Sequence, residues 1–255
     1  MTADHNLYDD PSLYDRLTSQ PTGSLDFFLG VVRASSGATL ELACGTGRLT
    51  IPIAQALAHE PMRRVTGLDL APTMLEGARR KAADAGVDVE LVQGDMRAFA
   101  LRRQFGTIFI AFNSLLHLTT NDALGECFAR VREHLAPGGA FAFDIFNPSV
   151  KFLARTPDER TTQTRIPDAE LGEIHVETTV DYDAATQVNH AAWHLSAPGR
   201  PDYARIPLTL RCIFPQELPV LLAASGFALE TRYGDFGDAP FTSDSARQVC
   251  VCRLA

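Results

Sequence analysis

The spacing of apolar positions divides the chain into two kinds of region. From about residue 38 to residue 146, short apolar runs alternate with stretches whose apolar residues recur at helical spacing. The short runs predict β-strands and the longer stretches predict α-helices. This alternation favours a doubly wound, mostly parallel sheet. The predicted strands are 38–43, 65–69, 88–92, 107–112 and 139–146, and the predicted helices lie near 24–35, 47–59, 71–85 and 121–135, the last with Asp122 as a possible cap.

The second half of the chain follows a different pattern. Residues 156–171 are polar and contain two prolines, so we expect a loop or a partly mobile segment there. Residues 173–213 alternate with period two, which predicts three antiparallel strands that form a small inserted sheet. A helix over 215–225 and an antiparallel hairpin of two strands, 227–233 and 248–254, are expected to complete the main sheet as its sixth and seventh strands.

A glycine turn joins the first predicted strand of the core to the helix that follows it. Gly45 and Gly47 remove two Cβ atoms from this turn, so a ligand can approach the backbone and the free N–H groups of the helix start. Such a turn suits any nucleotide-like cofactor. A dinucleotide fingerprint would place a third glycine at the position of Thr50.

Acidic residues end three successive predicted strands. Glu41 ends the first, Asp69 the second, and Asp95 follows the third. An acid about 20 residues beyond a glycine turn is typical of a site that binds a ribose diol. Because parallel strands end at the same edge of a sheet, we expect the three carboxyls to share one rim. Each acid alone would also fit a solvated strand end or a helix cap.

These segments, taken together, resemble the class I S-adenosylmethionine-dependent methyltransferases. The resemblance rests on the turn from Glu41 to Gly47, on Asp69, on Gly94-Asp95-Met96 and on the segment from Leu135 to Gly139. It covers roughly residues 35–148. In overall layout the chain resembles bacterial small-molecule methyltransferases, including those that dimethylate the amine of nucleotide-linked amino sugars.

The resemblance implies a cofactor, an activity and a set of binding residues. The cofactor is S-adenosylmethionine, and the activity is methyl transfer to a small-molecule acceptor, with nitrogen favoured over oxygen. Glu41 and the turn backbone would bind the methionyl part, Asp69 the ribose and Asp95 the adenine amino group. Either Met74 or Met96 would flank the adenine ring. The candidate cofactor-binding residues are Tyr14, Glu41, Ala43, Gly45, Thr46, Gly47, Asp69, Leu70, Met74, Asp95, Met96 and Phe112.

The same resemblance suggests four segments. Residues 1–35 form an N-terminal helical lid, and residues 36–150 form the cofactor-binding α/β core. Residues 151–214 form the inserted sheet on the substrate side, and residues 215–255 complete the core. In the first segment, Tyr8 and Tyr14 are expected to cover the cofactor; the alternative is a helix that docks two tyrosines on the core surface.

His117 is the candidate catalytic residue. It ends the segment after the fourth predicted strand, whose tip lies beside the reactive methyl group in this fold. The resemblance to sugar N-methyltransferases places it where a base has been suspected, and a neutral imidazole could accept the proton of an amine or a hydroxyl. Alternatively, His117 only packs or hydrogen-bonds at a helix start, since an amine can enter already deprotonated.

Composition and charge narrow the class of partner. The net charge is -8 and no basic run is present, which argues against a nucleic-acid partner. No stretch is long and apolar enough for a transmembrane helix, and the polar start lacks signal-peptide character. The five cysteines have neither disulfide nor zinc spacing, so we expect reduced thiols in a cytoplasmic protein. A metal site on the histidines at 175, 190 and 194 is not expected, and the oligomeric state stays open.

Two other functions fit parts of this pattern. One is a catalytically silent protein that binds the cofactor or a partner, and the other is a nucleotide-dependent oxidoreductase. The three intact acids argue against the first. The Thr50 position and the closing β-hairpin argue against the second.

Overall fold

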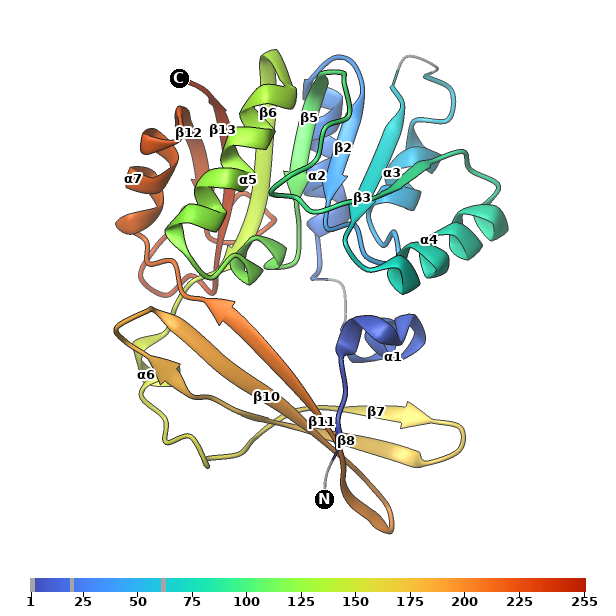
Figure 1. Ribbon diagram of the computed structural model, residues 1–255, viewed down its shortest axis with the longest axis vertical. Helices are drawn as coiled ribbons and strands as arrows, with labels where there is room; N and C mark the ends of the chain where they lie inside the picture. Colours follow the sequence, from blue (N-terminus) through green and yellow to red (C-terminus); the bar gives the residue numbers. More distant parts are fainter. Residues whose placement is uncertain (1–2, 19–20, 61–62) are drawn as a thin grey trace. The chain divides into compact units, whose positions relative to one another are not determined.

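The computed structural model describes residues 3–18, 21–60 and 63–255 and divides them into two compact units (Figure 1). The first unit combines the N-terminal segment with Pro148–Cys212, and the second combines the stretch between that segment and Asn147 with Ile213–Ala255. Of the predicted N-terminal lid segment, residues 1–2 and 19–20 lie outside the described residues.

A seven-stranded sheet forms the centre of the second unit, in the order β12-β13-β6-β5-β2-β3-β4. The pairs β4–β3, β3–β2, β2–β5 and β5–β6 are parallel, whereas β13 runs antiparallel to both of its neighbours. The doubly wound fold class predicted from the sequence is therefore confirmed. The strands are β2 (Thr39–Leu42), β3 (Val65–Asp69), β4 (Glu90–Gln93), β5 (Phe105–Ile110), β6 (Leu135–Phe146), β12 (Phe227–Tyr233) and β13 (Arg247–Leu254).

Helices connect these strands as the sequence predicted. Thr120, and not Asp122, caps α5: its hydroxyl accepts a hydrogen bond from the Ala123 N–H at 3.1 Å. Asp122 lies in the first turn of the helix, where a carboxylate favours the positive end of the helix dipole. The helices of this unit are α2 (Ser24–Ala34), α3 (Thr50–Ala56), α4 (Pro72–Ala85), η2 (Ser114–His117), α5 (Asn121–His134) and α7 (Glu217–Ala224).

Side-chain alternation along β6 builds two cores on opposite faces of the sheet. Phe141 packs against Phe128 of α5, with ring centroids 5.9 Å apart. Ala140 and Ala142 point the other way, toward the cluster that contains Phe28 of α2. Figure 1 shows α5 in front of the sheet and α2 behind it. Both faces of the sheet are therefore covered, as a parallel sheet requires.

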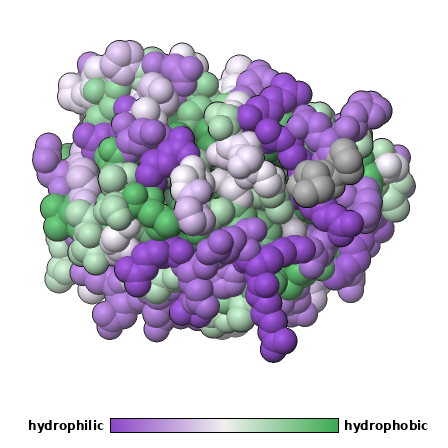
Figure 2. Space-filling view, turned by 90° about the horizontal axis from the view of Figure 1, so that it is seen from above, coloured by the Kyte–Doolittle hydropathy of each residue, from purple (hydrophilic) through white to green (hydrophobic). Residues whose placement is uncertain are grey.

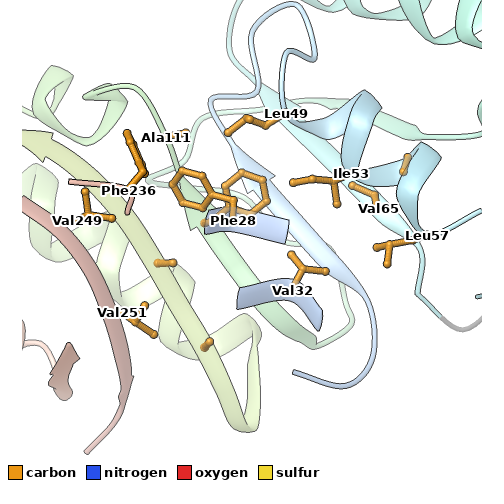
Figure 3. Packing of buried hydrophobic residues seen from close by; sticks show 14 residues of the cluster. Phe28, Val32, Leu49, Ile53, Leu57, Val65, Ala111, Phe236, Val249 and Val251 are labelled. Carbon is orange, nitrogen blue, oxygen red and sulfur yellow. The ribbon is translucent and has the colours of Figure 1, made fainter. Parts of the chain in front are cut away.

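Helix α2 belongs to this core, so the predicted segment 1–35 is not one unit. Phe28 and Val32 are almost completely buried (Figure 3). The Phe28 ring stacks on the Phe109 ring, with the centroids 4.9 Å apart. Burying a large apolar side chain stabilises a fold by about 1.5–3 kcal/mol, which binds α2 to the sheet. The sequence pattern showed the helix but not the sheet that it covers.

The first unit is an antiparallel sheet with a parallel edge strand, in the order β1-β11-β10-β8-β7, and β9 pairs with β10. The inserted antiparallel sheet that the sequence predicted is therefore confirmed. Its strands are β1 (Ala3–Asp4), β7 (Thr161–Asp168), β8 (Gly172–Thr179), β9 (Tyr182–Asp183), β10 (Val188–Ala197) and β11 (Arg200–Arg211), accompanied by η1 (Leu7–Asp9), α1 (Pro11–Leu17) and α6 (Val150–Leu153).

Strand β7 corrects the prediction of a loop over residues 156–171. The strand is polar and contains Pro167, which is why its sequence resembled a loop. It lies at the edge of the sheet, where polar side chains face solvent and a proline interrupts no second ladder of hydrogen bonds.

The N-terminal segment is part of this same sheet unit. His5 donates its backbone N–H to the Arg205 carbonyl at 2.8 Å, beside the parallel pairing of β1 with β11. Leu7 and Leu17 are buried in a cluster with residues of β8, β10 and β11. Tyr8 and Tyr14 pack against that cluster, with their ring centroids 6.0 Å apart. The segment therefore has its own apolar support within the unit.

The surface mixes polar and apolar side chains. In the view of Figure 2, hydrophilic residues cover much of the face and small apolar patches lie among them. All five cysteines are buried and free of disulfides. Among the described residues, no helix combines the length and the hydropathy needed to cross a membrane.

Candidate functional site

The carboxyl ends of the parallel strands meet at one edge of the seven-stranded sheet. Leu42 of β2 lies opposite Leu68 of β3 on one side and Ile110 of β5 on the other. Ile110 in turn lies opposite Phe143 of β6. The residues that follow each strand therefore come together, and they include most of the predicted cofactor-binding residues.

The glycine turn leaves β2 in an unusual backbone conformation. Ala43, Gly45 and Gly47 have φ values of 55°, 54° and 77°. A Cβ on Gly47 would lie 2.8 Å from Cδ1 of Ile51, so only glycine fits there without displacing the start of α3. The Cys44 N–H donates to the Leu68 carbonyl at 3.0 Å, which ties the turn to β3.

Glu41 is a buried carboxyl with a hydroxyl as its hydrogen-bond donor. The side chain is only 3% exposed, and the Thr50 hydroxyl donates to its Oε2. Burial raises the pKa of Glu41 to about 8, and the Thr50 hydrogen bond offsets part of that rise. Thr50 thus has a function at the position where a dinucleotide fingerprint would place glycine.

Asp69 joins the end of β3 to the glycine turn. Its Oδ2 accepts the Gly45 N–H at 2.7 Å and its Oδ1 accepts the Ala71 N–H at 2.9 Å. Burial raises the pKa of Asp69, and these two backbone hydrogen bonds act in the opposite direction. Leu70, the next residue, is 64% exposed, so its apolar side chain is available to a ligand at this edge.

Asp95 lies one strand further along the edge. Its Oδ2 accepts a hydrogen bond from Nη2 of Arg97 at 2.6 Å, and this contact lowers the pKa of Asp95. Met96 beside it is partly exposed, whereas Met74 is fully buried within α4. Of the two methionines predicted to flank an adenine ring, Met74 therefore has no accessible surface, because it faces the core side of its helix.

Thr46 has a contact that the sequence did not suggest. Its hydroxyl accepts a hydrogen bond from Nζ of Lys81 at 2.9 Å, so α4 supports the glycine turn from outside. Thr46 itself is buried. Its predicted role in cofactor binding would therefore pass through its backbone.

Phe112 and His117 follow β5 at the same edge. Phe112 has a φ of 59°, and the Arg48 guanidinium lies over its ring, 4.8 Å from the centroid. His117 ends η2, and its side chain reaches solvent. Desolvation by the surrounding protein lowers the pKa of His117, which favours the neutral imidazole.

A buried ion pair behind the tip of β5 was missed by the sequence analysis. Asp144 of β6 accepts the Phe112 N–H on Oδ1 at 2.8 Å and Nη1 of Arg247 on Oδ2 at 2.7 Å. The Asp144 side chain is 1% exposed. A lone acid in the apolar run of residues 141–146 was the signal available in the sequence.

Tyr14 is the one predicted cofactor-binding residue in the antiparallel unit. Its ring packs with Tyr8 there, and its role as a lid stays a prediction. Across the described part of the chain, no group of three or more His, Cys, Asp or Glu side chains has the geometry to hold a metal ion.

Comparison with known proteins identifies the domain to which this edge of the seven-stranded sheet belongs. A family profile described as "Methyltransferase domain" matches residues 39–139, from the first residue of β2 into β6. The chain also superposes on the CcbJ methyltransferase of Streptomyces caelestis with a TM-score of 0.82 and 26% identity, covering 99% of this chain and 100% of that one.

Residues 39–139 therefore form a methyltransferase domain. This match agrees with the family and the cofactor predicted from the sequence. In this domain, the glycine turn and the acids at the ends of β2, β3 and β4 are the candidate cofactor site.

Two relatives indicate the breadth of the match. A dTDP-3-amino-3,4,6-trideoxy-alpha-D-glucopyranose N,N-dimethyltransferase of Streptomyces venezuelae is 39% identical over 102 residues, which is 39% of this chain and 38% of that protein. The putative methyltransferase YqeM of Bacillus subtilis is 29% identical over 249 residues, which is 92% of each chain. The more similar relative is therefore matched over well under half of its length.

Proposed function

We propose that the chain transfers the methyl group of S-adenosylmethionine to an amine nitrogen of a small molecule, and that an amino sugar is the best-fitting acceptor class. The observation that carries the proposal is the meeting of the glycine turn, Glu41 and Asp69 at one sheet edge. Similarity to the amino-sugar N,N-dimethyltransferase supports nitrogen as the acceptor atom.

The chemistry of the site residues fits this cofactor. Glu41 is a buried carboxyl whose pKa is raised to about 8. A cationic group bound beside it would lower that pKa and pair with the charged carboxylate. The methionyl ammonium is such a group. Asp69 presents a carboxylate at a strand end, where two ribose hydroxyls can donate to it. Asp95 would accept a hydrogen bond from the adenine amino group, and Leu70 and Met96 would offer apolar contact to the ring.

The protein mainly supplies position and protection from water. When bound, S-adenosylmethionine supplies a methyl group on a positively charged sulfur, so the leaving group is already activated. The tip of β5, with Phe112 and His117, would orient the acceptor for in-line attack. A neutral His117 can accept the proton that the product ammonium releases, but an amine that enters deprotonated needs no base to attack.

Substrate binding by the antiparallel unit stays a prediction, as does a cytoplasmic location. The five free cysteines are compatible with a reducing compartment. A nucleic-acid partner is disfavoured by the net charge of -8.

Turnover on matched acceptors tests the proposal. The chain and S-adenosylmethionine are incubated with a nucleotide-linked amino sugar and with the same compound carrying a hydroxyl in place of the amine. Mass spectrometry should show one or two added methyl groups on the amine and none on the hydroxyl compound. Methylation of the hydroxyl alone, or of neither compound across a panel of amines, would contradict the proposal.

A further inference from the structure

Two consecutive residues other than glycine adopt the left-handed backbone conformation at the tip of β5. Phe112 has a φ of 59° and Asn113 a φ of 62°. For residues other than glycine, each left-handed conformation costs roughly 1–3 kcal/mol and persists only where the surroundings enforce it. The tip of β5 therefore needs a specific support.

Strand β6 provides that support through Asp144. Its Oδ1 accepts the Phe112 N–H at 2.8 Å, and its backbone carbonyl accepts the Asn113 N–H at 3.2 Å. In return, the Asn113 side-chain oxygen accepts the Phe146 N–H at 2.7 Å. Three hydrogen bonds thus replace the regular ladder between β5 and β6 at the point where the chain turns away.

A cation on the next strand favours the charged form of Asp144: burial raises the pKa of Asp144 to about 6, and Arg247 offsets part of that rise. Nη1 of Arg247, on β13, lies 2.7 Å from Oδ2 of Asp144. A carboxylate with 1% exposure would otherwise be strongly disfavoured, because desolvation opposes the charged form. The Arg247 guanidinium also lies over the Phe236 ring, 5.7 Å from its centroid, which restricts its position. The support for β5 thus extends across β6 to β13.

We propose that Asp144 and Arg247 are positioning residues for methyl transfer: together they hold Phe112 and the turn that carries His117 in the geometry that the reaction needs. The inference rests on the proposed function. It adds to the candidate cofactor-binding residues an ion pair that lies behind the tip of β5. Apolar residues could fill the same space with no charge to bury, so support of the strained tip gives this buried ion pair a role.

The kinetic test compares Asp144→Asn, Arg247→Met and Arg247→Lys. Asp144→Asn keeps an acceptor for Phe112 and removes the charge, whereas Arg247→Lys keeps the charge and loses the planar geometry. The acceptor is the best amine found in the turnover panel. We expect Asp144→Asn and Arg247→Met to lower kcat by roughly 10–100-fold, because small misplacements at a reacting centre are costly. Affinity for S-adenosylmethionine should change by less than about threefold, and Arg247→Lys should restore part of kcat.

A matched control separates positioning from stability. Gln248, the neighbour of Arg247 on β13, is buried and donates to the Ile213 carbonyl at 3.1 Å. Gln248→Met removes a buried hydrogen bond in the same strand and should lower the unfolding midpoint without lowering kcat. An equal loss of kcat in Gln248→Met would overturn the proposal, as would kcat within threefold of wild type in both Asp144→Asn and Arg247→Met.

Amide NMR signals test the positioning role of Asp144 and Arg247 even if no acceptor is found. In amide ¹H–¹⁵N spectra of the chain loaded with S-adenosylmethionine, Asp144→Asn and Arg247→Met should shift the signals of Phe112 and Asn113. The signals of Gly45 and Gly47 should not move. Unmoved signals at 112 and 113 would overturn the positioning role. Failure of the wild-type chain to methylate any amine would contradict the proposed function alone.

Discussion

At the scale of single residues, the candidate site is built around buried carboxyls. The sequence predicted Glu41 and Asp69 because each follows an apolar run at a motif position, and the structure brings both to one edge. It did not predict Asp144, because that residue belongs to no motif and its partner Arg247 lies 103 positions away. Long-range ion pairs of this kind leave no spacing pattern in a single sequence.

The raised pKa of Glu41 predicts a pH dependence of stability. The pKa is about 8 in the folded chain against an ordinary value of 4.5, so between these values the folded state holds a proton that the unfolded state has lost. The free energy of unfolding should therefore fall as the pH rises from about 5 to 8, by at most about 1.4 kcal/mol per unit for this group. Denaturant titrations of Glu41→Gln should show a shallower dependence than wild type. The same dependence of the unfolding free energy on pH in both chains would contradict the raised pKa of Glu41.

Asp69→Ala should weaken cofactor binding. The ribose hydroxyls lose a charged acceptor. The turn also loses the 2.7 Å hydrogen bond from the Gly45 N–H to Oδ2 of Asp69. We expect a loss of about 1–3 kcal/mol in binding free energy for S-adenosylmethionine, measured by calorimetry. Asp183→Ala is the matched control, since Asp183 accepts the Ala185 N–H at 2.9 Å in a turn of the other unit. A folded Asp69→Ala chain with wild-type affinity would show that this acid is not the ribose anchor.

His117→Asn distinguishes two chemistries. For an amine acceptor that enters neutral, the variant should lose about tenfold in kcat or less, because positioning dominates. For a hydroxyl acceptor, loss of a base should cost on the order of 10²–10⁴. The lowered pKa keeps the imidazole neutral near pH 7, so the smaller loss should be flat across neutral pH. A large loss with intact cofactor binding would make His117 the catalytic base and overturn the preference for nitrogen.

At the scale of elements, the core could be predicted and the edges could not. The helical and strand periods of residues 38–146 reflect the burial of apolar side chains on one face of an element or on both. The structure buries those same side chains, so the elements could be predicted. Strand β7 is polar, half-exposed and at an edge, so its sequence carries no comparable pattern. Strand β1 has two residues and pairs with β11, a contact between distant segments that local pattern cannot show.

Two glycines offer an element-scale test of packing. A Cβ on Gly106, in β5, would lie 1.5 Å from the Ser36 carbonyl oxygen, so Gly106→Ala must displace backbone before β2. We expect a loss of roughly 3 kcal/mol or more in the free energy of unfolding. Gly125→Ala is the control, because nothing lies within 4 Å of its added Cβ in α5, and helix propensity predicts a gain of about 0.5–1 kcal/mol. Similar losses in both variants would contradict this packing.

At the scale of the whole molecule, the chain builds one unit from two distant segments. It leaves the seven-stranded unit after Asn147 and returns at Ile213, and the N-terminal segment joins the inserted sheet through β1 and the buried Leu7 and Leu17. The sequence predicted the insertion, because the period of the pattern changes there. It assigned the N-terminal segment to a lid, because nothing in residues 1–18 indicates which sheet they join.

The central claim is that the edge formed by the glycine turn, Glu41 and Asp69 is a site for S-adenosylmethionine. Calorimetric titration of the full chain with S-adenosylmethionine, and separately with NAD, tests it most directly. The account predicts saturable binding of S-adenosylmethionine at one site per chain, weakened by Asp69→Ala, and no binding of NAD. Binding of NAD in its place, or no binding of S-adenosylmethionine by the folded chain, would contradict it.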